Sequence, residues 1–389
     1  MSAEHHAVVV IGGGPAGSAA ARTLAAKGVD VCVIDKASFP RAKLCGGLLT
    51  LRSRKLFTQI FGEAAWAPAF EYEAHGIRLF HQDRCLSEVD NHSALYFTCR
   101  RRFDHYLLGL ARQQGAMVHE GDGLASVDLA GKVCHLQSGR QMAYDHLIGA
   151  DGVNSMVART LFGAAYERSK IAFALEMDVS RGHLPREVTR PEIYFGVVKW
   201  GYGWVFPKQD TVTVGVGGIQ ARNPNMKQAF EAFLTQVFGT MPPGKMKGHH
   251  IPFGDYKRRP GAAGVLLAGD AAGLVEPITG EGIAFAMQSG YFAGLAVLEA
   301  MRSPHAGVSA LAAYQRHSTE ITRALDHAKR LRYLIFPSPS ERLLVKMLPR
   351  SATLTRKHLD LMADEIGYGD YARYIGTRAI KGLVSGRFF

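Results

Sequence analysis

Residues 12–17, with the sequence GGGPAG, contain a glycine spacing that suits the binding of phosphate groups. Gly12, Gly14 and Gly17 stand in the order G-x-G-x-x-G. In such a turn the first glycine permits a sharp change of direction, the second lets the backbone approach a pyrophosphate, and the third lets a helix pack closely on a strand. The chemistry predicted by this segment is the binding of a dinucleotide cofactor through its phosphates.

The elements that would position these glycines are a strand before them and a helix after them. Residues 7–11 are continuously apolar, which is typical of a parallel strand buried on both faces. A helix is predicted from about Pro15 to Lys27, with Ala16 in its first turn. The unpaired N–H groups and the positive dipole end at the start of this helix would face the phosphates.

An acidic residue completes the pattern. A second strand, residues 31–34, ends at Asp35, eighteen residues after Gly17, and Lys36 follows. A carboxylate at this position accepts hydrogen bonds from adenosine ribose hydroxyls. Because strand, glycines, helix, strand and acid occur in order, they predict dinucleotide binding more strongly than the glycines alone, but they do not separate FAD from NAD.

Two later segments separate these cofactors. Residues 265–273 form an apolar strand that ends in Gly269-Asp270, and residues 147–155 carry Asp151 in a similar turn. An Asp at such a strand end can hold a ribityl hydroxyl while the following helix faces the phosphates. Each segment alone also suits an ordinary turn between strand and helix. Together with the glycine turn, the two segments predict FAD.

With these motifs the chain resembles the aromatic hydroxylase flavoprotein superfamily, which includes p-hydroxybenzoate hydroxylase, and within it the geranylgeranyl reductase family. Arg100 and Asp104 match the superfamily's R-x-x-F-D segment. Three segments match the narrower family: PRAKLCGGL at 40–48, YGWVFP at 202–207 and PITGEGI at 277–283. The resemblance covers roughly residues 7 to 300.

The resemblance implies roles for three of these places. It puts Cys45 near the isoalloxazine ring as a proton donor or redox thiol, although an isolated Cys is more often a small buried filler. The loop around Glu281 would stabilise the negative charge of reduced flavin through N–H groups at a helix start, the alternative being a plain helix start. Arg100 would neutralise an FAD phosphate or reach the ribityl chain, and Arg101 and Arg102 would face solvent.

Residues 192–217 are rich in aromatic and β-branched side chains and predict two antiparallel strands joined near residues 208–210. Such strands would form a sheet over the flavin and give the substrate an apolar wall. Ordinary core packing accounts for most of these aromatic residues. Tyr202 and Trp204 are the two that we expect to face the cavity.

The predicted fold class is α/β (α+β overall), with a Rossmann-like FAD-binding domain, an inserted antiparallel β-sheet substrate domain and a C-terminal helical segment. The predicted domain ranges are 1–75, 98–165 and 260–300 for the first, 76–97 and 166–259 for the second, and 301–389 for the third. The predicted cofactor-binding residues are Gly12, Gly14, Pro15, Ala16, Gly17, Asp35, Lys36, Cys45, Gly46, Arg100, Asp151, Gly269, Asp270, Gly280, Glu281, Gly282 and Ile283. The catalytic candidates are Cys45, Tyr202 and Trp204.

Composition argues against several other classes of protein. The 389 residues include five scattered cysteines without a CxxC pair, which indicates a reduced, cytoplasmic chain without structural zinc, and we expect no signal peptide. His249 and His250 are adjacent on a predicted strand and would point to opposite faces, so no metal site is predicted.

The last ninety residues are predicted to be helical and basic. Leu311, Tyr314, Ile321, Leu325 and Ala328 recur at near-helical spacing. Pro337 and Pro339 would end this helix and residues 342–348 would begin another. The preceding stretch, 282–301, is apolar enough to be considered as a membrane span, but its Gly and Ala content and its place after a cofactor loop favour a buried helix.

The net charge of +12 is concentrated late in the chain: residues 323–389 hold 13 Lys and Arg against 6 Asp and Glu. Three interpretations stay open: a solvated surface, contact with an acidic protein, or peripheral contact with the anionic inner face of a membrane where a lipid substrate would enter. No nucleic-acid motif accompanies the charge, so no nucleic-acid partner is expected.

Two reactions are compatible with the motifs. The first is hydride transfer between flavin N5 and an apolar isoprenoid-like substrate, as the resemblance implies. The second is a monooxygenase reaction on an aromatic or protein-bound substrate through a flavin C4a-hydroperoxide, and a non-catalytic flavin-bound redox or assembly protein is a third alternative. NADPH or another reductant would donate the electrons, although only one dinucleotide fingerprint is present.

Overall fold

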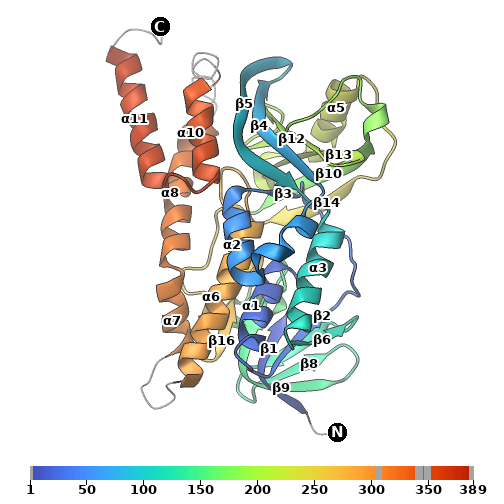
Figure 1. The fold of residues 1–389 in the computed structure, drawn as a ribbon, viewed down its shortest axis with the longest axis vertical. Helices are drawn as coiled ribbons and strands as arrows, with labels where there is room; N and C mark the ends of the chain where they lie inside the picture. Colours follow the sequence, from blue (N-terminus) through green and yellow to red (C-terminus); the bar gives the residue numbers. More distant parts are fainter. Residues whose placement is uncertain (1–2, 303–308, 338–344, 346–351, 385–389) are drawn as a thin grey trace.

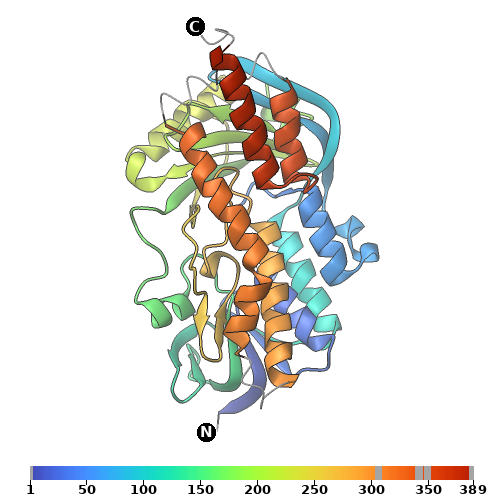
Figure 2. The same cartoon turned by 90° about the vertical axis from the view of Figure 1, so that its left-hand side faces the viewer.

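Two eight-stranded sheets, one above the other in Figure 1, organise the part of the chain described by the computed structural model: residues 3–302, 309–337, 345 and 352–384. The two chain termini lie at opposite ends of the long axis, with the first sheet at the end that holds the N-terminus and the second sheet at the end that holds the C-terminus. Helices cover the first sheet and continue along one side of the molecule to the second (Figure 2). The predicted α/β class with an added sheet and C-terminal helices is confirmed.

The first sheet has the order β15-β16-β9-β1-β2-β6 and is parallel from β16 to β6. Because parallel strands end at the same edge, the segments that follow β1, β2, β9 and β16 meet there. Those segments carry the glycine turn, Asp35, Asp151 and Asp270. The strands are β1 (Glu4–Ile11), β2 (Val31–Asp35), β6 (Met117–Glu120), β7 (Leu124–Asp128), β8 (Val133–Leu136), β9 (Gln141–Gly149), β15 (Gly261–Ala262) and β16 (Val265–Leu267), with β7 and β8 attached beside β9.

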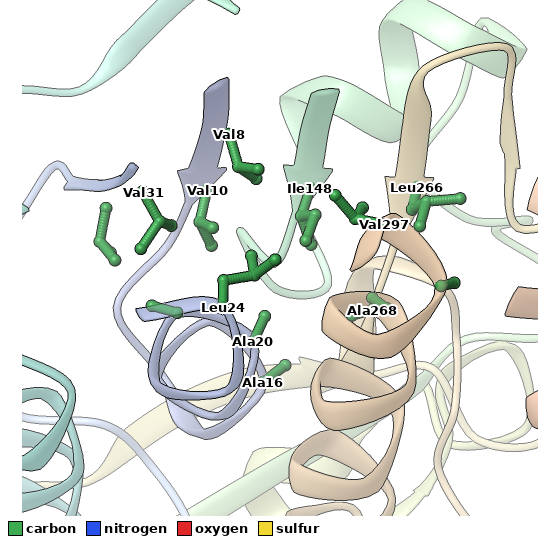
Figure 3. Packing of buried hydrophobic residues seen from close by; sticks show 14 of the residues in the cluster. Val8, Val10, Ala16, Ala20, Leu24, Val31, Ile148, Leu266, Ala268 and Val297 are labelled. Carbon is green, nitrogen blue, oxygen red and sulfur yellow. The ribbon is translucent and has the colours of Figure 1, made fainter. Parts of the chain in front are cut away.

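Two helices pack side by side on one face of this sheet. Figure 3 shows α1 (Pro15–Ala25) and α6 (Ile283–Arg302) beneath the apolar side chains of the strands, such as Val10, Ile148 and Leu266. Helix α6 is long and apolar enough to cross a membrane, but 67% of its apolar window is buried inside the protein. The prediction of a buried helix over residues 282–301 is confirmed. Three more helices belong to this half of the chain: α2 (Leu51–Phe61), α3 (Arg100–Gln113) and α4 (Met156–Phe162).

The second sheet has the order β14-β10-β13-β12-β11-β4-β5-β3, with only the β11–β4 pair parallel. Helix α5 (Met226–Phe238) packs its apolar side chains against one face. The strands are β3 (Leu48–Leu49), β4 (Tyr72–His81), β5 (Arg84–Phe97), β10 (Ala172–Ser180), β11 (Glu192–Phe195), β12 (Gly201–Pro207), β13 (Thr211–Ile219) and β14 (Lys247–Ile251). Strand β3 and the start of β4 belong to this sheet, although the predicted domain ranges assign residues 1–75 to the FAD-binding domain. The domain ranges stay a prediction.

The prediction of two strands over residues 192–217 is wrong, because the segment forms three. Val197 and Val198 favour a strand by residue type. Gly196, with φ of 79°, and Trp200, with φ of 54°, instead turn the chain between β11 and β12. The predicted turn at residues 208–210 is confirmed between β12 and β13.

The C-terminal segment is helical, as predicted, but the single helix expected before Pro337 is divided at Ser318 into two helices. Leu311 and Tyr314 on α7 (Ala310–His317) and Leu325 and Ala328 on α8 (Thr319–Ile335) are buried. Helix α8 ends before Pro337, whereas Pro339 and most of residues 342–348 lie outside the described residues. Helices α10 (Ala352–Met362) and α11 (Tyr368–Val384) follow, and α10 packs on the β4–β5 hairpin.

Candidate active site

A cavity of about 780 Å³ has walls from both sheets. Nearly all the predicted site residues line it, from the glycine turn and Asp35 to Cys45, Tyr202, Trp204 and the loop around Glu281. Two predicted cofactor-binding residues do not: Gly17 and Gly269 lie behind the lining. Both are sites of close packing, since a Cβ on Gly17 would be 1.8 Å from the Gly12 carbonyl oxygen and one on Gly269 would be 3.1 Å from the Ala16 Cβ.

The glycine turn has the geometry of a phosphate cradle. Gly12 has φ of 104°, which favours glycine, and a Cβ there would lie 2.3 Å from the Ala150 carbonyl oxygen. Gly14 precedes α1 and has space on its cavity side, where a Cβ would come no closer than 3.6 Å to Arg41. The backbone is therefore open to a ligand at the start of α1, where the helix has free N–H groups.

Asp35 fixes the same turn from β2. Its Oδ2 accepts a hydrogen bond from the Gly13 N–H at 2.7 Å, and its Oδ1 accepts one from Ala37 at 2.9 Å. A carboxylate has about four acceptor positions, so two remain for hydroxyl donors of a ligand.

The other two acidic strand ends differ from each other. The carboxylate of Asp151 caps α4: it accepts hydrogen bonds from Ser155 Oγ at 2.5 Å and Met156 N at 2.6 Å. Burial raises the pKa of Asp151. Asp270 lines the cavity within a short 3-10 turn, and its negative charge acts on Lys43.

Arg100 is held by a carboxylate of its own helix. Its guanidinium donates to Asp104 at 2.6 and 2.8 Å, and Arg41 reaches the same carboxylate at 3.2 Å. Asp104 is fully buried and pairs with both of these arginines. Arg100 still lines the cavity, and Arg101 and Arg102 are exposed as predicted.

Positive charge accumulates around the cavity. Burial lowers the pKa of Lys43, and burial together with the charges of Lys43, Arg100 and Lys36 lowers the pKa of His249 to about 3. Burial is the largest of these causes, and the positive charges act in the same direction. The cavity therefore suits an anionic ligand, and the pyrophosphate of FAD meets this requirement next to the glycine turn.

His249 and His250 are not arranged for a metal. His250 lies by the rings of Tyr166 and Phe173 and within 3.2 Å of the Gln220 amide oxygen. Within the described ranges, no three His, Cys, Asp or Glu side chains come together as metal ligands.

The loop before α6 is fixed by the start of helix α2. The Glu281 carboxylate accepts hydrogen bonds from Thr50 Oγ1 at 2.6 Å and from Arg52 at 3.1 Å. Its side chain is thus anchored, while Gly280, Glu281 and Gly282 line the cavity. From β12, the Tyr202 hydroxyl donates to the Thr279 carbonyl, which ties the aromatic wall to this loop.

Cys45 lies between the two walls. Its backbone N–H donates to Glu176 Oε1 at 2.8 Å, and its sulfur accepts a weak hydrogen bond from the Gly47 N–H at 3.4 Å. Arg100 also interacts with the Cys45 side chain. The predicted proximity of Cys45 to a cofactor is consistent with its place in the cavity lining.

Aromatic rings form the wall on the second sheet. Tyr202 and Trp204 have ring centroids 6.0 Å apart, and Trp204 and Phe206 are 6.3 Å apart. All three line the cavity. A Cβ on Gly46 would be 2.7 Å from Phe206, so the Cys45 loop can approach this wall only with glycine there.

Glu176 on β10 and Lys247 on β14 are among the lining residues that sequence reasoning missed as site candidates. The signal was present for Glu176, because Ala174, Glu176 and Asp178 alternate along one strand face. Nothing local showed which face would meet the cavity.

The sequence matches the protein family described as an FAD-binding domain over residues 5–198. It is 31% identical to a chloroplastic geranylgeranyl diphosphate reductase of Oryza sativa subsp. japonica, over 75% of this chain and 66% of that protein. It is 30% identical to a menaquinone reductase of Mycolicibacterium smegmatis, over 74% and 75%. It is also 30% identical to a digeranylgeranylglycerophospholipid reductase of Methanothrix thermoacetophila, over 82% and 85%.

Among solved structures, the fold is similar to a geranylgeranyl bacteriochlorophyll reductase-like protein from Thermoplasma acidophilum. The TM-score is 0.79 and the sequence identity 22%, with 97% of this chain and 100% of the other covered. The similarity extends over both sheets and the C-terminal helices.

Proposed function

Because the chain belongs to the geranylgeranyl reductase family of FAD-dependent oxidoreductases, we propose that it reduces a carbon–carbon double bond in an isoprenoid-like apolar substrate. The observation that carries the proposal is the shared cavity: the glycine turn and the aromatic wall of Tyr202, Trp204 and Phe206 line one continuous space. An apolar chain would lie against this wall next to the cofactor.

FAD, when bound, supplies hydride transfer. We assign the adenosine and pyrophosphate part to the glycine turn, Asp35 and the basic groups around Lys43. Backbone N–H groups of residues 280–282 would face the ring system and stabilise its negative charge after reduction. The protein's remaining tasks are to orient the substrate and to exclude water, and the Tyr202–Thr279 hydrogen bond holds the aromatic wall and the loop together for both tasks.

The test is a half-reaction under nitrogen. The FAD-loaded protein is reduced with dithionite, and geranylgeranyl diphosphate, a digeranylgeranylglycerophospholipid or menaquinone is added while flavin absorbance is followed. Reoxidation by one of these, with a product heavier by two hydrogens per double bond, is expected. For the first two compounds the matched control is the same compound with its chain fully saturated, which should leave the flavin reduced. Because the ring of menaquinone can itself accept two electrons from reduced flavin, the readout there is a chain that keeps two added hydrogens after the quinol has been reoxidised in air.

The outcome that would contradict the proposal is equally definite. If none of the three reoxidises the flavin under nitrogen, but oxygen plus substrate gives a hydroxylated product, the protein is a monooxygenase instead.

We further propose NADPH as the electron donor, bound without a second dinucleotide fingerprint. Flavin bleaching by NADPH, faster than by NADH at equal concentration under nitrogen, would support it. Failure of both nucleotides would point to a protein or small-molecule reductant.

For the basic C-terminal region we propose contact with an anionic membrane surface, through which a lipid substrate would reach the protein. Sedimentation with phosphatidylserine vesicles at moderate salt, and not with phosphatidylcholine vesicles, is expected. Absence of sedimentation with both would contradict the proposal and leave a solvated surface or contact with an acidic protein.

A further inference from the structure

Glu176 occupies the cavity face of the second sheet between a lysine and a tryptophan. On β10 it pairs with Lys247 on β14 on one side and with Gly215 on β13 on the other, and Gly215 pairs with Trp204 on β12. Residues paired across strands lie on the same face. Glu176, Trp204 and Lys247 all line the cavity.

Gly215 lets the tryptophan ring lean toward Glu176. A Cβ on Gly215 would be 2.2 Å from Trp204 Cζ2, so any larger residue would displace the ring. The ring therefore lies over the strand that separates Trp204 from Glu176. The carboxyl group and the aromatic wall form one surface of the cavity.

Two polar atoms of this surface lack partners. Glu176 is 3% exposed, and its Oε1 accepts the hydrogen bond from the Cys45 N–H. Its Oε2 and the Trp204 Nε1 are buried and have no hydrogen-bond partner among the residues that the structure describes. Buried polar atoms are nearly always paired, so two orphans on one cavity wall point to a ligand group between them.

The charges around Glu176 do not force it to ionise. Burial, with a smaller contribution from the charge of Asp178, raises the pKa of Glu176 to about 7, although the Cys45 N–H, Lys208 and Lys247 act in the opposite direction. Both lysines are engaged by Asp178, at 3.4 and 3.8 Å. A group of this kind holds a proton near neutral pH and can also give it up, as a general acid must.

We propose that Glu176 is the proton donor in double-bond reduction, delivering its proton from Oε2 to the substrate carbon that does not receive the hydride. This rests on the proposed function, since it needs the reduced cofactor as the hydride source. The O–H bond of Glu176 breaks and a C–H bond forms, with the π electrons of the double bond making that bond. The hydride supplies the second C–H bond, the cofactor becomes oxidised by two electrons, and solvent returns a proton to the carboxylate.

The experiment compares Glu176→Gln with the unaltered FAD-loaded protein in the same half-reaction under nitrogen. The amide oxygen can still accept from the Cys45 N–H, so the loop keeps its anchor while the acid is lost. We expect reoxidation by the isoprenoid to slow on the order of 100-fold or more, with FAD affinity and the rate of dithionite reduction unchanged. Glu176→Asp keeps a carboxylic acid and should be reoxidised about tenfold faster than Glu176→Gln.

An infrared readout separates this role from a structural one. The FAD-loaded protein without substrate should show a carbonyl band of a protonated carboxylic acid that disappears as pH rises through about 7, and Glu176→Gln should lack it. The proposal would be overturned if the isoprenoid reoxidised the flavin of Glu176→Gln at a rate within about threefold of that of the unaltered protein. The proposal would also be overturned if Cys45→Ser lost the pH dependence of reoxidation near pH 7 while Glu176→Gln kept it. If the unaltered protein is not reoxidised by any isoprenoid, the proposed function fails first.

Discussion

The charge of single side chains explains how the cavity is prepared for its cofactor. Burial is the main cause that holds the pKa of His249 at about 3, and the charges of Lys43, Arg100 and Lys36 contribute to it. Arg100 and Arg41 share the carboxylate of Asp104, and Lys36 and Lys43 add further positive charge to the cavity lining. An anion placed here gains their attraction and relieves their mutual repulsion.

This predicts a pH dependence of FAD binding. An anion near His249 raises its pKa, so the complex holds up to one more proton than the free protein between about pH 3 and 6.5. FAD affinity should therefore rise as pH falls through this window, by at most about tenfold per pH unit. Titration calorimetry at pH 5.5 in two buffers of different ionisation enthalpy measures the proton uptake.

The matched variants are His249→Gln and His183→Gln. The first should abolish the proton uptake, while the second, at an exposed position, should leave it unchanged. Equal uptake in all three proteins would show that another group is responsible.

At this scale the sequence predicted those residues whose role depends on their near neighbours. Gly12, Asp35 and Glu281 lie in local patterns that specify a turn or a strand end, and all three line the cavity. Glu176 and Lys247 could not be predicted in the same way, because they come together only through the pairing of β10 with β14. That register depends on long-range packing, which no local pattern reports.

At the scale of elements, the contact between α1 and α6 sets the position of the phosphate-binding turn. A Cβ on Gly290 in α6 would be 2.0 Å from the Ala16 carbonyl oxygen at the start of α1. The two helices are therefore as close as backbones allow. Because Ala16 also lines the cavity, any separation of the helices moves the cofactor site.

Gly290→Ala should accordingly destabilise the protein by about 1–3 kcal/mol and weaken FAD binding. The matched control is Gly109→Ala in α3, where a Cβ would have no atom within 4 Å. That change should stabilise the protein by roughly 0.5–1 kcal/mol, since alanine loses less backbone entropy in a helix. Urea denaturation and FAD titration of both variants check this, and equal effects of the two substitutions would contradict it.

Elements were predicted well where the residue types and their spacing indicate the same structure. The apolar strand, the glycine turn and the alanine-rich helix of residues 7–25 were predicted correctly, and so were the buried positions of α7 and α8. The segment 192–217 misled because its valines favour a strand through a turn that depends on Gly196 and Trp200. Aromatic residues with positive φ are uncommon, so the residue type at position 200 did not indicate a turn.

Across the whole molecule, one arginine joins three distant parts of the chain. Arg52 on α2 donates to Glu281 before α6. It also donates to the Leu361 carbonyl at the end of α10 and to Asp364 between α10 and α11. The side chains of Arg52 and Glu281 are 10% and 8% exposed. The C-terminal helices are thus connected to the loop that lines the cofactor cavity.

Arg52→Leu should cost about 3–5 kcal/mol, because it leaves the buried Glu281 carboxylate without its cation. FAD affinity should fall as well, since Glu281 lines the cavity. On the same helix, Arg54→Leu breaks a pair with Glu63 in which both side chains are well exposed, and should cost at most about 1 kcal/mol. Thermal unfolding of both variants measures the difference, and a similar loss from each would refute the assignment.

The span of the cavity lining has a consequence for biosynthesis. Ile11, at the end of the first strand, and Met362, in α10, line the same space. Ribosomes add about 5–20 residues per second, so roughly 20–70 s separate the two ends of the lining during translation. Over that interval the nucleotide-binding turn is present but unenclosed, and flavin can be sealed in only after residue 362 has emerged and α10 has docked. Flavin retention would therefore distinguish polypeptides that have reached α10 from those that terminated early.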